Sequence, residues 1–373
     1  MQTLSELDPA GKRVFYHPDY SVPLVDGKIT DDYRITTTFA SLDYLIKKGA
    51  KIIIGSKMGD PKGKHVPELE LRPVAEYLAN HYTEHAVHLA HEIEHAEVTA
   101  AIEAMQPGDM LILPNLRFYP EEQANDKAFA EKLAALADVY VNDAFSVDHR
   151  SDASIVTLPT LLPSYAGFQL VKELESLGSL VEKPEHPFVV IMGGAKVSDK
   201  IEVINALATH ADAILVGGAM ANTFLLAKGE KIGSSLAETE KVDLAKQLIE
   251  ELGEKLVLAE DYVKDKDTEE FRYLDIGPKA IEQFKSYLAE AKTIFWNGSV
   301  GYAEDPQYAV ATEELAKFIG SLEGVTSVVA GGDTVSIITN LNLREKFTFV
   351  STGGGAALDF LAGEKLPGVE VLK

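Results

Sequence analysis

The chain has 373 residues, of which 46% are hydrophobic and 25% are charged, as is typical of a globular protein with two or three domains. Its 58 acidic residues outnumber the 35 lysines and arginines, and the net charge of -23 disfavours binding to nucleic acid or to anionic membranes. Cysteine is absent, which excludes disulfides and thiolate chemistry.

Short runs of Val, Ile and Leu alternate with longer amphipathic segments along nearly the whole chain. This alternation predicts parallel sheets covered by helices. The predicted strands are Arg13–Tyr16, Lys51–Gly55, Met110–Leu113, Val139–Val141, Phe188–Met192, Ala213–Val216, Lys255–Leu258, Thr293–Trp296, Ser327–Val329 and Thr348–Ser351.

The loops after the first four predicted strands contain charged and polar side chains. They are His17, Asp19, Lys57, Asp60, Arg117, Asp143, Asp148, His149 and Arg150. A solvated loop explains any one of them alone. The loops at one sheet edge converge, however, so Arg34, Lys57, Arg117 and Arg150 together favour a small-anion site in the N-terminal half.

A motif in the N-terminal half offers a different interpretation. The run His91-Glu-Ile-Glu-His95 fits H-E-x-x-H, the pattern of zinc proteases, with His85 and His88 nearby. A third ligand is not evident from the sequence, and a solvated helix explains the run better. The motif therefore stays a minor alternative.

A leucine-rich helical segment predicts the end of the first half. Leu170, Leu174, Leu177 and Leu180 recur at helical spacing, and the helix breakers of Lys183–Pro187 follow them. We interpret this breaker-rich stretch as the domain boundary.

The second half contains four strand-like runs that break into glycines and restart as helices. They are FVVIMGGAKVSDK, ILVGGAMANTF, SVVAGGDTVSIITN and FVSTGGGAALDF. Glycine allows a close approach of the backbone to a ligand, while the free amides of the next helix attract anions. Tight turns also use glycine for packing alone, but four such junctions in one half favour a phosphate-binding sheet edge.

The segment GGAKVSDKI places Lys196 and Lys200 one helical turn apart, directly after a glycine pair. It is neither a Walker A loop nor a G-x-G-x-x-G fingerprint. A lysine at this position can neutralise charge on a transferring phosphoryl group. The alternative is an ordinary solvated helix start.

Two further turns carry polar residues beside glycine. Asp333 in AGGDTVS suits a carboxylate that reaches a phosphate-bound Mg²⁺, although a helix cap would look the same. Asn297 and Glu304 in WNGSVGYAED are candidate nucleotide contacts or members of a polar turn. A nucleotide in one half and an anion in the other would suit group transfer.

The start MQTLSELDPAGKRV is polar and unlike a signal peptide. The longest apolar stretch, Ala211–Ala227, contains Asp212 and Asn222 and falls short of a membrane span. We therefore expect a cytoplasmic protein without a membrane partner.

With these residues in view, the chain resembles the phosphoglycerate kinase family from about Gly11 to its C-terminus. The resemblance is carried by GGAKVSDKI, GGAMANTF, LDIGP, WNG, GGDT, STGGGAALDFL and LPGVEVL. It implies two doubly wound parallel-sheet α/β domains joined by a helix. It also implies reversible phosphoryl transfer between ATP and the carboxylate of 3-phosphoglycerate in glycolysis or gluconeogenesis, with Mg²⁺, as the domains of a monomer close.

The resemblance also implies a domain organisation. Residues 1–168 would form the domain for the acid substrate, residues 169–187 the joining helix and linker, and residues 188–355 the nucleotide domain. Residues 356–373 would return to the first domain. The implied partners are small molecules, which are the nucleotide and the phosphorylated acid.

Roles follow from the resemblance for residues that match family motifs. Lys196 and Arg34 would be catalytic, and Asp333 would take Mg²⁺. The implied substrate ligands are Asp19, Ser21, Arg34, Lys57, Asp60, Arg117 and Arg150. The implied nucleotide ligands are Gly194, Lys196, Lys200, Gly218, Asn297, Glu304, Gly331, Gly332, Asp333, Thr334, Gly354 and Gly355.

The substrate motifs depart from the family pattern. R-V-D-F-N-V-P appears as His17–Pro23, and S-H-L-G-R-P appears with Lys57 for histidine and Asp60 for arginine. In D-A-F-G-T-A-H-R-A-H, the glycine is Ser146 and the last histidine is Asp152. An aspartate beside a phosphate repels it and removes a bidentate donor. A divergent paralogue that uses another acid, or that only binds nucleotide, is therefore the alternative.

Overall fold

The computed structural model describes residues 1–93 and 96–373 and divides into two compact units. The first unit comprises Met1–Leu174 and Lys365–Lys373, and the second comprises Glu175–Glu364. The division falls inside helix α8 (Phe168–Glu182), which lies in the segment expected to join the domains. Residues 356–364 belong to the second unit, since α15 (Gly355–Leu361) packs against α9 (Ile201–Ala208).

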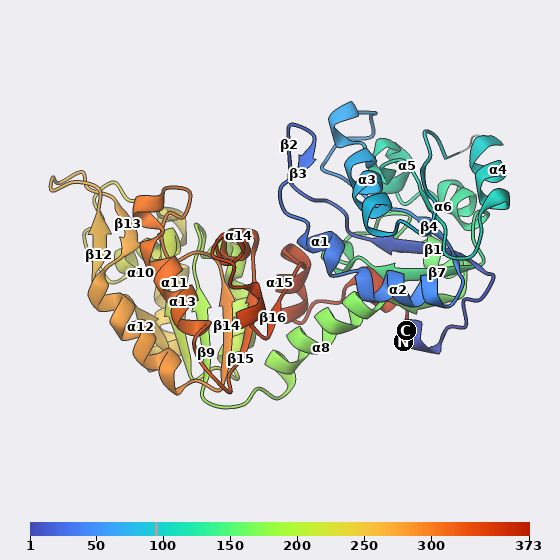
Figure 1. The fold of residues 1–373 in the computed structure, drawn as a ribbon. Coiled ribbons are helices and arrows are strands. Elements are labelled where there is room, and N and C mark those ends of the chain that lie inside the picture. Colours follow the sequence, from blue (N-terminus) through green and yellow to red (C-terminus); the bar gives the residue numbers. More distant parts are fainter. Residues whose placement is uncertain (94–95) are drawn as a thin grey trace. The chain divides into compact units, whose positions relative to one another are not determined.

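The first unit is built on a six-stranded sheet in the order β5-β6-β4-β1-β7-β8, with every paired strand parallel (Figure 1). Its strands are β1 (Arg13–Pro18), β4 (Lys51–Ile54), β5 (Val87–Leu89), β6 (Met110–Ile112), β7 (Val139–Asp143) and β8 (Ser164–Ala166). The helices of this unit are α1 (Tyr33–Thr36), α2 (Phe39–Lys47), α3 (Arg72–His81), α4 (Ala96–Ala104), α5 (Pro120–Gln123), α6 (Lys127–Ala134), α7 (Leu158–Leu161) and α16 (Pro367–Glu370). A small hairpin pairs β2 (Leu24–Val25) with β3 (Lys28–Ile29).

The second unit repeats this architecture with the strand order β11-β10-β9-β14-β15-β16, again parallel throughout. Its sheet strands are β9 (Phe188–Met192), β10 (Ala213–Val216), β11 (Leu256–Leu258), β14 (Thr293–Asn297), β15 (Thr326–Ala330) and β16 (Phe349–Val350). The remaining helices are α10 (Gly218–Ala227), α11 (Val242–Leu252), α12 (Pro278–Glu290), α13 (Val310–Ile319) and α14 (Gly332–Asn340). An antiparallel ribbon joins β12 (Tyr262–Lys264) to β13 (Tyr273–Ile276).

The predicted α/β class with two parallel sheets is confirmed. All ten predicted strands are present, but the sequence analysis missed the edge strands β5 and β8 and both small antiparallel pairs. β5 and β8 are each three residues long and include polar His88 and Ser164. A short edge strand contacts the core weakly, so its composition does not stand out from that of a loop.

Buried apolar side chains on the central strands form the core of the first unit. Val14, Tyr16, Ile52 and Ile54 are fully buried between the sheet and its helices. Burying a side chain of this size stabilises the fold by about 1.5–3 kcal/mol. Within the described part of the chain, no helix is both long and apolar enough to cross a membrane.

A buried polar network lies beside this core. Ser154 donates its backbone N–H to Glu122 Oε2 at 3.0 Å and its hydroxyl to Glu122 Oε1, and its hydroxyl also lies 3.0 Å from His17 Nε2. Burial raises the pKa of Glu122 to about 7 and lowers the pKa of His17 to about 4. The interior therefore favours the neutral form of both groups.

Glu122→Gln tests this network through the pH dependence of stability. Because the pKa of Glu122 is raised in the folded state, the unfolded chain ionises first, and stability is lost as pH rises from about 4.5 to about 7. The glutamine does not titrate, so we expect E122Q to lose less unfolding free energy than the parent between pH 5 and pH 8, by on the order of 3 kcal/mol. Urea denaturation followed by circular dichroism at both pH values measures this difference.

The exposed neighbour Glu121 provides the control. Glu121→Gln should leave the parent's pH dependence unchanged. Equal slopes for the parent and E122Q would show that burial of Glu122 does not perturb its titration.

Candidate active site

Three of the four glycine junctions of the second unit line one cavity. They follow β9, β15 and β16, which lie with β14 side by side in the sheet, and all four strands end at the same edge because they are parallel. The cavity at this edge has a volume of about 350 Å³. It is lined by Gly194, Ala195, Lys196, Asp199, Lys200, Asn297, Gly298, Gly331, Gly332, Asp333, Gly354, Gly355 and Leu358.

Lys200 lies in the wall of this cavity. Its Nζ donates to the carbonyl oxygens of Gly193 at 2.5 Å and Asn297 at 3.2 Å. Burial lowers the pKa of Lys200 to about 8, against the opposing effect of Asp333 and Asp199. A cation held by carbonyl dipoles is well placed to attract an anion entering the cavity.

Gly194 shows why this turn requires glycine. Its φ of 94° lies in the left-handed region, and a side chain on the neighbouring Gly218 would collide with its backbone. Lys196, two residues later, is exposed and contributes to the cavity lining. The turn therefore places both the Gly194 backbone and Lys196 in the lining of the smaller cavity.

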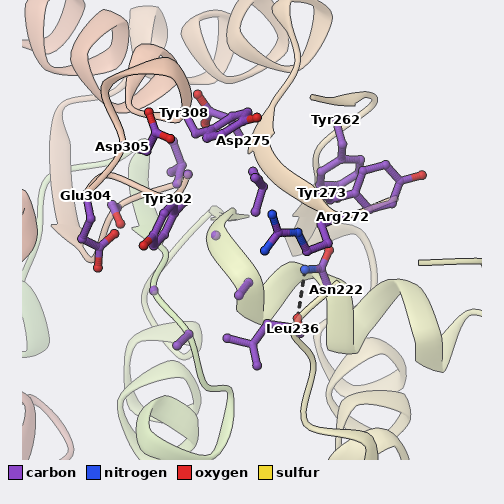
Figure 2. Close-up of a pocket in the computed structure, with 18 of the residues that line it drawn as sticks. Asn222, Leu236, Tyr262, Arg272, Tyr273, Asp275, Tyr302, Glu304, Asp305 and Tyr308 are labelled. Carbon is purple, nitrogen blue, oxygen red and sulfur yellow. Dashed lines mark hydrogen bonds between the residues drawn. The ribbon is translucent and has the colours of Figure 1, made fainter. Parts of the chain in front are cut away.

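A larger cavity of about 780 Å³ adjoins the first, because Gly194, Ala195 and Asp333 line both. Figure 2 shows Tyr302 and Glu304 on one wall and Arg272 and Tyr273 on the opposite wall. Leu236 is 65% exposed and lines the same space. Aromatic and apolar side chains interspersed with polar ones, beside a glycine-lined cavity, suit a nucleoside followed by its phosphates.

The structure distributes the predicted nucleotide residues over these two cavities. Gly218 and Glu304 line the larger cavity, and Asn297, Gly331, Gly332, Gly354 and Gly355 line the smaller one. Thr334 is the exception, because its side chain is fully buried in the first turn of α14. The sequence analysis missed the wall residues Leu236, Arg272 and Tyr302, which lie outside the glycine junctions that signalled the site.

In the first unit, Asp19 is hydrogen-bonded to side chains from two other strand ends and from α1. It follows β1 and accepts hydrogen bonds from Arg34, from Lys57 after β4 at 3.0 Å, and from Ser146 after β7. The backbone N–H of Ser21 donates to it at 3.0 Å. Burial alone would raise the pKa of Asp19, but Lys57, Arg34 and these hydrogen bonds outweigh it, so its pKa lies well below the usual range.

Arg117 lies on the same edge and is 95% buried, since only 5% of its surface is exposed. Its Nη1 donates to Gly59 O at 3.1 Å, and Gly59 N–H donates to Ser21 Oγ at 3.2 Å. Arg117 Nη2 also lies 3.7 Å from the buried carboxylate of Asp152. The arginine therefore already has an anionic neighbour in the protein.

The structure thus brings Asp19, Ser21, Arg34, Lys57 and Arg117 together. Asp60 and Arg150, by contrast, are both exposed. The sequence analysis missed Ser146 as a partner of Asp19, because a serine after a strand carries no signal until the strands are placed side by side.

The alternative zinc site receives no support. His91 and Glu92 are exposed, while His95 lies outside the described residues. Within residues 1–93 and 96–373, no three histidine, cysteine or acidic side chains are grouped closely enough to hold a metal ion.

Comparisons with known proteins agree with this geometry. A model of the phosphoglycerate kinase family matches residues 4–364. The chain is 43% identical to a phosphoglycerate kinase of Thermus thermophilus over 100% of both chains. It is 42% identical to one of Pseudothermotoga lettingae, over 98% of this chain and 97% of the relative.

Solved structures give the same result. The chain superposes on phosphoglycerate kinase from Coxiella burnetii with a TM-score of 0.86 and 34% identity, covering 99% of this chain and 98% of the other. For the enzyme from Pyrococcus horikoshii, the TM-score is 0.88 and the identity 30%, with coverage of 100% and 98%.

Asp19→Asn tests the charge balance of the cluster in the first unit. The substitution leaves Lys57 and Arg34, whose side chains are only 14% and 31% exposed, without their shared anion. We expect the unfolding free energy to fall by roughly 2–4 kcal/mol, somewhat less than for a fully buried pair. Urea denaturation measures the change.

The matched control is Asp60→Asn, which removes an exposed carboxylate from the neighbouring loop. It should change the unfolding free energy by at most about 0.5 kcal/mol. Indistinguishable curves for D19N and D60N would contradict the proposed charge balance.

Proposed function

Because the chain belongs to the phosphoglycerate kinase family and so transfers a phosphoryl group between ATP and 3-phosphoglycerate, we propose that its second unit binds the nucleotide and its first unit binds the acid. The observation that supports this assignment most directly is the pair of adjoining cavities in the second unit. One, of about 780 Å³, has room for a nucleoside and contains several tyrosines in its walls, and the other is lined mainly by glycine, with Lys196 and Lys200.

On the nucleotide side, the larger cavity takes the base and ribose, with Glu304 accepting hydrogen bonds from the ribose hydroxyls and Gly218 beneath the nucleoside. The smaller cavity takes the phosphates. Their proposed ligands are Gly194, Lys196, Lys200, Asn297, Gly331, Gly332, Gly354 and Gly355, with Thr334 supporting the turn from below.

Asp333 fits the proposed Mg²⁺, because it lines both cavities and so borders the proposed path of the phosphates. Mg²⁺ prefers oxygen ligands and commonly takes one or two carboxylates together with substrate phosphates. When bound, the ion would neutralise charge on the phosphate oxygens. The remaining positive groups proposed to act on the phosphates, Lys196 and Lys200, belong to the chain itself.

On the acid side, Arg34 would contact the substrate carboxylate, and Asp19 with Ser21 would bind its hydroxyl. Lys57, Arg117 and Arg150 would bind its phosphate. Asp60 is exposed, so water and salt screen the repulsion between its carboxylate and the substrate phosphate. Of these assignments, Arg117 has the strongest support, because its charge is buried beside the cluster around Asp19.

The chemistry requires no general base, since the acceptor carboxylate is already ionised. One of its oxygens attacks the γ-phosphorus of ATP, and the bond between that phosphorus and the oxygen bridging to the β-phosphate breaks, leaving ADP. Lys196 would neutralise the moving phosphoryl group, and Arg34 would orient the attacking carboxylate. We further propose that the enzyme acts as a cytoplasmic monomer.

Lys196→Ala tests the catalytic assignment. Loss of an ammonium that acts on the moving phosphoryl group should lower kcat by roughly 100-fold or more, while the KM values for ATP and 3-phosphoglycerate change only a few-fold. A coupled assay with MgATP and 3-phosphoglycerate measures both parameters. Lys231→Ala, which removes an exposed lysine outside the cavity linings, should behave like the parent. Unchanged turnover in K196A would refute the role of Lys196.

Asp152→Asn tests the acid side. Removing the carboxylate 3.7 Å from Arg117 increases the positive charge available to the substrate phosphate. We expect the KM for 3-phosphoglycerate to fall roughly three- to tenfold, equivalent to about 1 kcal/mol, with little change in the KM for ATP. The free protein should lose stability, because a buried cation loses its anion.

The double variant provides the control for this prediction. In an Arg117→Ala background, Asp152→Asn should no longer improve the KM, since the two effects act through one guanidinium. An equal gain with and without Arg117 would contradict this explanation.

A further inference from the structure

A carboxylate from a distant loop holds the segment that carries Lys196. Glu238 Oε2 accepts the backbone N–H of Ser198 at 3.0 Å, and Oε1 accepts the hydroxyl of Ser198 at 2.5 Å. Two donors of Ser198, two residues after Lys196, therefore converge on one side chain.

Glu238 is itself fixed to the wall of the nucleoside cavity. Its backbone N–H donates to Thr223 Oγ1 at 3.0 Å, and Thr223 is fully buried in α10. Two residues earlier, Leu236 O accepts a hydrogen bond from Asn222 Nδ2 at 3.0 Å (Figure 2). The stretch from Leu236 to Glu238 is thus attached to α10 at both ends.

The Glu238 carboxylate also acts on Lys196 through its charge. Burial alone would raise the pKa of Glu238, but the bonds from Ser198 and the nearby charge of Lys196 outweigh that effect and lower it. The carboxylate is therefore ionised at neutral pH and attracts the Lys196 ammonium while it holds the backbone. A conventional cap would act on the amides alone.

We propose that Glu238 is a positioning residue, which fixes the Lys196–Lys200 turn to helix α10 so that the Lys196 ammonium faces the phosphate cavity. This inference rests on the proposed role of Lys196 in phosphoryl transfer. Without Glu238 the turn loses the anchor for one amide and one hydroxyl. Lys196 then spends less time in the reactive geometry, although the nucleotide still binds to the glycine-lined walls.

The arrangement also connects the two cavities. Leu236 lines the nucleoside cavity, and Glu238, two residues later, holds the Lys196–Lys200 turn at the phosphate cavity. A base that packs against Leu236 would hold the same short stretch that positions Lys196. Binding energy from the nonreacting base can thereby favour the reacting geometry.

Glu238→Ala and Glu238→Gln test the proposal in the full-length protein, with MgATP and 3-phosphoglycerate as substrates. We expect E238A to lower kcat about tenfold or more while the KM for ATP stays within about twofold of the parent. E238Q keeps one carbonyl acceptor and should recover part of the loss. Glu240→Ala is the matched control, because Glu240 is exposed two residues away.

Ser198→Ala keeps the experiment informative if E238A folds poorly, since it removes only the hydroxyl that donates to Glu238. It should show a smaller loss of the same kind, in kcat and not in KM. A purely structural cap predicts a different result, a lower melting temperature with unchanged kcat in the folded fraction. That result would overturn the proposal.

A double-mutant cycle with Lys196→Ala separates this inference from the function on which it rests. If Glu238 acts through Lys196, E238A should cause little further loss in the K196A background. Additive losses in kcat would overturn the role of Glu238 and leave that of Lys196 intact. Full activity in K196A would instead refute the proposed function of Lys196.

Discussion

Both sites depend on one constraint, the parallel direction of the strands in each sheet. Parallel strands end at a common edge, so the residues that follow adjacent strands are brought together even when they are far apart in the chain. In the first unit, β4, β1 and β7 are neighbours and deliver Lys57, Asp19 and Ser146 to one cluster. In the second unit, the same geometry delivers four strand ends to the glycine-lined cavity.

The two edges differ in how their cations are compensated. Lys200 is held by the carbonyl oxygens of Gly193 and Asn297, which carry only partial charge. Arg34, Lys57 and Arg117 instead lie against the carboxylates of Asp19 and Asp152. An anion that enters the first unit must therefore compete with carboxylates that contact its cations, whereas Lys200 in the second unit donates to carbonyl oxygens, although Asp199 and Asp333 line the same cavity.

Much of the fold could be predicted, because buried parallel strands are continuous apolar runs and glycine marks their ends. Edge strands such as β5 and β8 were missed, since they contribute few apolar residues to the core. Most residues proposed for the nucleotide line the two cavities of the second unit, whereas two of those proposed for the acid are exposed. A glycine pair in the sequence marks directly the turn where the backbone can approach a ligand. The direction of a long side chain, in contrast, depends on the residues that pack around it. Asp60 and Arg150 illustrate this, because both belong to family motifs and both are exposed.

The amino-acid sequence by itself determined the α/β class and the family, because these depend on local periodicity and contiguous motifs. Only the tertiary structure decided which charges meet. Ser146 bonds to Asp19 across 127 residues, Asp152 lies beside Arg117, and Glu238 bonds to Ser198 across 40 residues. Such contacts arise when distant segments pack on a shared sheet edge, and no local pattern encodes the distance between side chains that meet only after folding.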